Sequence, residues 1–169
     1  MKKWIYRERK DGRSEPREWT CRLETFSPRF ASLLWSRGIS SEEEAERFMN
    51  PCLRHLSRPG LWPGMSEGAQ LLFSGILSGK KFAVWGDYDV DGVTATTLVC
   101  QVLAHYDIPV TWHLPQRRSE GYGLNIPELE KLADEGIRLL LTVDCGISDL
   151  AAIARARELG IDVVVSDHH

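Results

Sequence analysis

Three aspartates at alternating positions, Asp87, Asp89 and Asp91, carry the densest chemistry in this sequence of 169 residues. They follow a short apolar run at residues 82–85, and glycines flank them on both sides. Three carboxylates so close together repel one another unless a counter-charge lies between them. Carboxylate oxygens are also the ligands that Mg²⁺ and Mn²⁺ prefer. The spacing therefore predicts a divalent-cation site on a tight loop between a strand and a helix.

Two known loop types share part of this pattern. Residues 87–92 match the start of an EF-hand calcium loop, but the twelfth position, where that loop has a glutamate, is Leu98. An EF-hand also needs a helix where a strand is predicted here. The segment from Asp89 to Thr94 is similar to the nucleophile loop of haloacid-dehalogenase-type phosphatases, in which the first aspartate directly follows the strand. We exclude the EF-hand and keep the phosphatase loop as an alternative.

Two further polar groups follow apolar runs later in the chain. Asp144 follows residues 139–143, and an Asp-His-His triplet, residues 167–169, follows residues 161–165. Alone, Asp144 could cap a helix and the histidines could be a tag remnant. In a parallel sheet, however, all three groups project from the edge at which ligands bind. Their recurrence at three strand ends therefore favours one shared site.

Carboxylates that bridge two metal ions, about 3.5–4 Å apart, form a known arrangement for phosphate-ester hydrolysis. Asp144 stands alone on its loop and is the natural bridging ligand, with an imidazole completing one coordination sphere. Cys145 follows it, but no histidine or basic residue lies near Cys145 in the sequence to activate a thiol. We interpret Cys145 as a small residue in a tight turn.

Apolar periodicity and capping signals predict the elements that position these groups. Residues 1–26 are expected to form an irregular arm or short strand, and a connector is expected at residues 53–64. The expected helices cover residues 28–37, 41–50, 65–78, 93–106, 126–135 and 149–159. The expected strands cover residues 82–85, 110–114, 139–143 and 161–165. Strands that are continuous apolar runs predict a parallel sheet covered on both faces.

The expected fold class is therefore α/β, a Rossmann-like parallel sheet with helices on both faces, preceded by an N-terminal helical segment. We expect a division into residues 1–80, the arm and helical segment, and residues 81–169, the first part of a catalytic α/β domain. A hydrophobic content of 43% fits a globular chain, and a net charge of −3 gives no global basic field for nucleic acid, although a local basic groove is compatible with it.

The four cysteines are scattered without a CxxC pair, which argues against a zinc site or a disulfide framework. The N-terminus lacks the apolar core of a signal peptide, and no apolar run approaches the roughly 18 residues of a membrane span. We expect a soluble cytoplasmic protein with no membrane partner.

Four segments carry a resemblance to a known family: GDYDVDGVTAT, PQRRSEGYGLN, LLLTVDCGIS and GIDVVVSDHH. In this order they resemble the motifs of the RecJ family of exonucleases, which belongs to the DHH phosphoesterase superfamily. LLWSRGI and EEAERFMNP resemble the N-terminal helical segment of that family. The resemblance implies two Mn²⁺ or Mg²⁺ ions and 5′→3′ hydrolysis of single-stranded DNA from a free 5′ end to mononucleotides. It also implies a role in DNA repair and recombination, with a helicase and a single-strand-binding protein as candidate partners.

The resemblance also implies roles for individual residues. The implied metal ligands are Asp89, Asp91, Asp144 and His168. The implied catalytic residues are Asp87, Asp167 and His169, with His169 near the scissile phosphate. The implied substrate-binding residues are Arg117 and Arg118, directed toward phosphates, and Tyr122, directed toward a base. For each arginine the alternative is a solvated surface charge.

The chain departs from the family pattern in three respects. Trp85 stands where some superfamily members have a metal-binding histidine, and the connector at residues 57–65 is less acidic than expected. Family members also continue through a further metal-binding aspartate, a second lobe and an OB-fold. We therefore expect an N-terminal part of a longer enzyme that is inactive alone. The alternatives are a DHH-type hydrolase of short oligonucleotides or cyclic dinucleotides, and a non-catalytic replication scaffold.

Overall fold

The computed structural model describes residues 27–169, so the arm or strand expected at residues 1–26 lies outside the described residues. Contacts divide the chain into two units, with the boundary between Arg58 and Pro59. Each unit is described by itself. None of the helices described from residue 27 onward is long and apolar enough to cross a lipid bilayer.

Within its described part, residues 27–58, the first unit contains two short helices, α2 (Pro28–Ser36) and α3 (Glu42–Met49), followed by the 3₁₀ turn η1 (Leu53–His55). The capping signal before α3 acts as the sequence predicts. The Ser41 hydroxyl accepts the backbone N–H of Glu44, and the Glu44 carboxylate accepts the backbone N–H of Ser41. The helices share a small core, made of Ala31, Leu34 and Ala45. The two predicted helices are thus confirmed.

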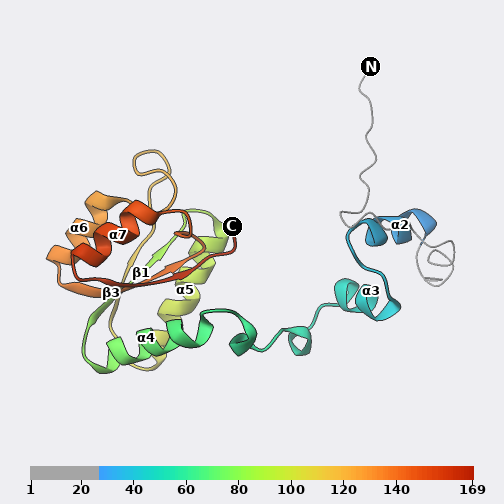
Figure 1. Ribbon diagram of the computed structural model, residues 1–169, viewed down its shortest axis with the longest axis horizontal. Coiled ribbons are helices and arrows are strands. Elements are labelled where there is room, and N and C mark those ends of the chain that lie inside the picture. The colour runs from blue at the N-terminus through green and yellow to red at the C-terminus, as the bar shows by residue number, and fades with distance from the viewer. Residues whose placement is uncertain (1–26) are drawn as a thin grey trace, which may run out of the picture. The chain divides into compact units, whose positions relative to one another are not determined.

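The second unit is a four-stranded parallel sheet flanked by helices, which confirms the expected fold class (Figure 1). Its strands are β1 (Lys81–Gly86), β2 (Val110–His113), β3 (Ile137–Val143) and β4 (Asp162–Ser166). Its helices are η2 (Pro59–Leu61), α4 (Met65–Leu77), α5 (Val90–His105), α6 (Ile126–Asp134) and α7 (Leu150–Glu158). The strand order is β2-β1-β3-β4.

Helices cover both faces of this sheet. One face packs under α6 and α7, and buries Trp85, Leu140 and their neighbours. The opposite face packs under α4 and α5, and buries Val84 and Leu139. Successive strand residues point to opposite faces, so a strand segment buried on both sides must be apolar, as residues 82–85 of β1 and 139–141 of β3 are.

Helix α4 belongs with the sheet, although the sequence led us to group it with residues 1–80. Gly75 of α4 lies so close to β3 that a Cβ atom at this position would be 2.8 Å from Cδ2 of Leu139. The missing side chain therefore lets the helix approach the sheet. The boundary between the contact units consequently precedes the division expected between residues 80 and 81.

The strand order places the topological switch point of the sheet between the carboxyl ends of β1 and β3. The chain passes from β1 to β2 on one side of it, and then crosses to β3 on the other side. Loops that leave two adjacent strands in opposite directions open a crevice there, where α/β proteins bind ligands. The register pairs Trp85 with Thr142 and Gly86 with Val143. Asp87 and Asp144, one residue further along each strand, therefore lie side by side.

Candidate metal centre

Asp87 and Asp144 are the buried acidic residues of the candidate metal centre. They are 3% and 8% exposed, respectively. Asp144 has a φ of 63°, in the left-handed region that non-glycine residues rarely adopt. The following turn is closed by Thr142, whose hydroxyl donates to the carbonyl of Cys145 at 2.8 Å. The chain thus reverses directly after β3 and holds the Asp144 carboxylate at the sheet edge.

Asp89 joins the site from the start of α5. Its Oδ1 accepts the backbone N–H groups of Asp91 and Gly92 at 3.0 and 3.1 Å. This cap lets α5 begin at Val90, three residues earlier than the sequence led us to expect. Because capping uses one carboxylate oxygen, the other is left for a ligand.

Among residues 27–169, two groups of side chains could each hold a metal ion. Asp87, Asp89 and Asp144 form one group, and Asp144, His168 and His169 form the other. Within each group, one ligand atom from every residue lies within 4.8 Å of the others. Asp144 belongs to both groups, which is the position expected of a bridging carboxylate.

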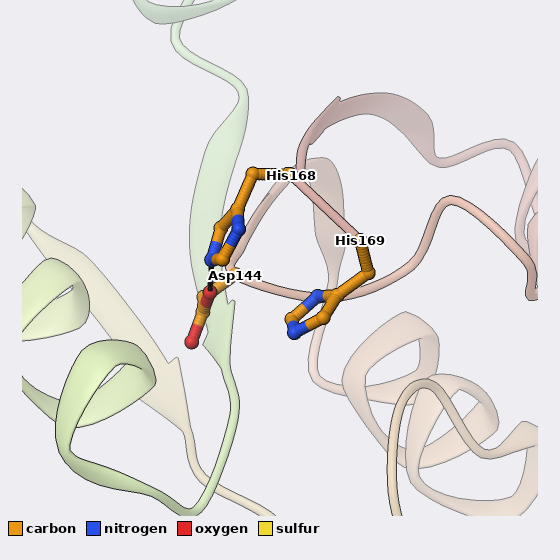
Figure 2. A group of neighbouring side chains, drawn as sticks. All are labelled: Asp144, His168 and His169. Carbon is orange, nitrogen blue, oxygen red and sulfur yellow. Dashed lines mark hydrogen bonds and ion pairs between the residues drawn. The ribbon is translucent and has the colours of Figure 1, made fainter. Parts of the chain in front are cut away.

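The terminal triplet approaches Asp144 through His168. The Nε2 atom of His168 lies 2.8 Å from Oδ1 of Asp144 (Figure 2). The rings of His168 and His169 stack, with their centroids 4.5 Å apart. Both imidazoles therefore reach the same end of the sheet as the aspartate loop.

Asp167 has a different environment from the other acidic residues of the site. Its carboxylate accepts the backbone N–H groups of Ile147, His168 and His169, at 3.0, 2.7 and 3.1 Å. Burial opposes ionisation, but these hydrogen bonds prevail and lower the pKa of Asp167 to about 2. Asp167 thus connects the loop after β3 to the terminal triplet, and it lies outside both groups.

The donor set fits a hard divalent cation. Oδ1 of Asp87 and Oδ2 of Asp144 are buried and have no hydrogen-bond partner among the residues described. Burial raises the pKa of Asp87, and the nearby charges of Asp89 and Asp144 raise it further. Buried carboxylate oxygens without partners are destabilising unless a cation compensates them. Mn²⁺ or Mg²⁺ would supply that compensation.

His169 is held from two sides. Its Nδ1 lies 2.8 Å from Oδ1 of Asp167 and 3.1 Å from the hydroxyl of Tyr122. The contact with Asp167 raises the pKa of His169. Desolvation and the surrounding negative charges raise the pKa of Tyr122 to about 12, so this residue remains a neutral phenol. With Nδ1 engaged, Nε2 is the ring atom left for another ligand.

The loop between β2 and α6 carries the predicted substrate-binding residues, and the structure brings two of them to the site. Tyr122 contacts His169, as described above. The guanidinium of Arg117 lies over the ring of Tyr88, 5.3 Å from its centroid, and Tyr88 separates two aspartates of the loop after β1. Arg118 is exposed at the adjacent position.

Asp91 is exposed in the first turn of α5 and lies outside both ligand groups. Its predicted role as a metal ligand, like the role of Arg118, stays a prediction.

Three residues near the site were not predicted from the sequence: Tyr88, Glu120 and Asp149. The ring of Tyr88 contacts the guanidinium of Arg117. Glu120 and Asp149 accept backbone hydrogen bonds from the loop between β2 and α6, which contains Arg117. Only Asp149 had a signal, because it is the first residue of a predicted helix. That signal points to a helix cap, and Asp149 occupies the N-cap position of α7 without making a capping hydrogen bond.

Trp85 occupies the position at which some superfamily members have a metal-binding histidine. Its side chain is buried in the core cluster under α6 and α7, and its ring lies against His113 with centroids 4.2 Å apart. Trp85 therefore lies on the face of the sheet opposite α5 and packs in the hydrophobic core under α6 and α7.

The Cys145 thiol is expected to be unreactive in the folded protein. Cys145 is fully buried, its Sγ lies 3.8 Å from the carbonyl oxygen of Trp85, and burial raises its pKa to about 12. Because the thiolate is the reacting species, alkylation by iodoacetamide near pH 8 should modify Cys52 and Cys100, which are partly exposed, well before Cys145. Peptide mass spectrometry over time measures this order. Rapid labelling of Cys145 without unfolding would contradict it.

Comparison with known proteins identifies relatives of this chain. Residues 81–169 match the model of the DHH family, N-terminal domain. The chain is 36% identical over 144 residues to the single-stranded-DNA-specific exonuclease RecJ of Bacillus subtilis, in an alignment that covers 85% of this chain and 18% of that protein. It is 37% identical over 145 residues to RecJ of Thermus thermophilus, covering 84% of this chain and 20% of that protein.

Two solved structures of RecJ proteins are also similar to this chain. A crystal structure of exonuclease RecJ bound to manganese matches 63% of this chain and 27% of its own, with 40% identity and a TM-score of 0.58. The structure of RecJ from Thermus thermophilus in complex with Mn²⁺ matches 90% of this chain and 20% of its own, with 30% identity and a TM-score of 0.62. The chain spans about a fifth of the length of the curated relatives it matches.

Proposed function

Because the chain belongs to the DHH family, we propose that it forms the metal-binding part of a phosphodiesterase that degrades single-stranded DNA from its 5′ end. The observation that carries this proposal is the position of Asp144 in both groups of potential ligands. One carboxylate shared by two ligand groups would let two metal ions lie close together, as in two-metal hydrolysis of a phosphodiester. The names of the relatives, which are exonucleases specific for single-stranded DNA, support the choice of substrate.

The ions in this proposal are Mn²⁺ or Mg²⁺. The residues that would hold them are Asp89, Asp91, Asp144 and His168, with Asp87 beside them. When bound, the ions lower the pKa of a water molecule and neutralise charge on the phosphoryl group. The unpartnered oxygens of Asp87 and Asp144 support the proposal, since a cation would satisfy both.

The chain's other residues would position the substrate. Asp167 holds Nδ1 of His169, so Nε2 is free to contact the scissile phosphate. Arg117 and Arg118 would bind backbone phosphates, and the ring of Tyr122 would contact a base. The contact of Arg117 with Tyr88 supports this arrangement, since it places the guanidinium beside the aspartate loop.

The proposal extends to the cellular role. A nuclease restricted to single strands depends on proteins that open a duplex, so a helicase and a single-strand-binding protein are the proposed partners. DNA repair and recombination in the cytoplasm is the proposed setting. Because the relatives are about five times longer, we propose that residues 1–169 alone bind metal but turn over little or no DNA.

Single-stranded DNA labelled at either end tests this function. The assay compares residues 1–169 with a polypeptide that continues the chain to the full length of its relatives, in the presence of Mn²⁺. We expect the long protein to release a labelled mononucleotide from the 5′-labelled strand at once, to release the 3′ label only late, and to spare duplex DNA. The short chain should bind Mn²⁺ without turnover.

Each other outcome selects a different function. Hydrolysis of short oligonucleotides or cyclic dinucleotides alone would indicate the other DHH-type hydrolase. If the long protein neither binds Mn²⁺ nor degrades DNA, the result would indicate a non-catalytic scaffold. Processive 5′→3′ degradation by residues 1–169 would contradict the proposed inactivity of the short chain.

A further inference from the structure

The loop at residues 115–125, between β2 and α6, reaches the candidate metal centre at two points. The Tyr122 hydroxyl contacts Nδ1 of His169 at 3.1 Å, and their rings meet edge to face with centroids 5.9 Å apart. Arg117 lies over the ring of Tyr88. Both contacts are made by exposed side chains, so they cannot by themselves fix the course of the loop.

Glu120 fixes the middle of the loop to the end of β2. Its Oε2 lies 2.8 Å from Nε2 of His113 and accepts the side-chain amide of Asn125 at 3.2 Å. Its Oε1 accepts the backbone N–H of Gln116 at 3.0 Å. The ring of His113 in turn lies against buried Trp85, tilted by 43°. The glutamate thus ties both ends of the loop to the packed core, and these hydrogen bonds lower its pKa.

Asp149 fixes the end of the loop to α7. Its Oδ2 accepts the backbone N–H of Leu124 at 2.7 Å, while its side chain makes no capping hydrogen bond with α7. The loop passes so close that a Cβ atom on Gly123 would be 2.4 Å from the same oxygen. Gly123 also has a φ of 80°, which favours glycine. The segment next to Tyr122 is therefore built around the Asp149 carboxylate.

We propose that Asp149 and Glu120 are positioning residues for substrate, which hold the loop so that Tyr122 stays against His169. Neither carboxylate belongs to the two ligand groups, so they act on the substrate side of the site and not on metal binding. The identity of the substrate rests on the proposed function. The positioning itself rests only on the hydrogen bonds from the loop to β2 and α7.

Asp149 variants separate this role from a general effect on folding. Asp149→Ala removes the acceptor for Leu124 N–H, whereas Asp149→Asn retains a side-chain oxygen at the same place. Asp134→Ala, an exposed aspartate at the end of α6, is the matched control. For each variant, NMR measures the exchange rate of the Leu124 amide and the ring resonances of His169. Calorimetry measures Mn²⁺ affinity, and fluorescence anisotropy measures the affinity for a 5′-phosphorylated oligothymidylate.

In Asp149→Ala, we expect faster exchange of the Leu124 amide and shifted His169 resonances. Oligonucleotide affinity should fall about tenfold or more, the loss that one hydrogen bond to a charged group represents. Mn²⁺ affinity should fall much less than oligonucleotide affinity, since Asp149 itself belongs to neither ligand group. Asp149→Asn should recover most of the oligonucleotide affinity, and Glu120→Ala should repeat the effects of Asp149→Ala.

Two results would overturn the proposal: unchanged Leu124 exchange and His169 resonances in Asp149→Ala, or a loss of Mn²⁺ affinity equal to the loss of oligonucleotide affinity. If the unmodified chain does not bind the oligonucleotide, the proposed substrate is wrong. The amide exchange and the His169 resonances then still decide whether Asp149 positions the loop.

Discussion

Replacing Asp144 by asparagine is expected to abolish tight Mn²⁺ binding, with an affinity loss of more than about 100-fold. Residues that merely orient a metal ligand already contribute about 10- to 100-fold to affinity. Asp144 belongs to both ligand groups and has a buried oxygen that no described residue satisfies, so its loss would affect both groups at once. Isothermal titration calorimetry of the variant with Mn²⁺ measures the effect.

Asp134→Asn is the matched control for this experiment, because it makes the same chemical change at an exposed position on α6. It should leave Mn²⁺ affinity unchanged. Asp91→Asn should be measured beside it, because Asp91 is a predicted ligand that lies outside both groups. Tight Mn²⁺ binding by Asp144→Asn would remove the basis of the proposed two-metal site.

Replacing Gly92 by alanine is expected to destabilise the second unit by about 3 kcal/mol or more, the upper range for overpacking. A Cβ atom at Gly92 would be 2.4 Å from both the backbone nitrogen and the backbone oxygen of Asp87. These are main-chain atoms of the turn after β1, which cannot rotate aside as the end of a flexible side chain could. The first turn of α5 or the aspartate loop would therefore have to move.

The same movement would reach the metal centre, because Asp87 and Asp89 lie on the turn that Gly92 touches. We therefore expect weaker Mn²⁺ binding together with a lower midpoint of urea unfolding. Gly60→Ala provides the control, since no atom lies within 4 Å of a Cβ built at that position. Unfolding of Gly92→Ala at the same urea concentration as Gly60→Ala would contradict the close approach of α5 to Asp87.

Local sequence signals predicted the elements well, because their interactions span only a few residues. The capping box at Ser41 and the cap of α6 at Asn125 join atoms three positions apart, and both form as predicted. The continuous apolar runs predicted a parallel sheet with two covered faces. The start of α5 was misplaced because Asp89 serves both as a helix cap and as a member of the metal site.

Helix α4 shows why the expected domain division differed from the contact boundary. Its sequence reads as another amphipathic helix in a helical segment. Its contact with the sheet depends on the close approach of Gly75 to Leu139, which is distant along the chain. No local pattern encodes which surface such a helix covers.

The sequence by itself determined which residue types could bind metal and that they follow strand ends, since alternating aspartates and apolar runs are local features. Only the tertiary structure decided how their atoms are used. The pairing of β1 with β3 sets Asp87 beside Asp144 and leaves one oxygen of each without a partner among the described residues, while Asp167 is turned toward backbone N–H groups. The physical reason is that a carboxylate's role depends on the donors that surround it, and here those donors come from distant parts of the chain.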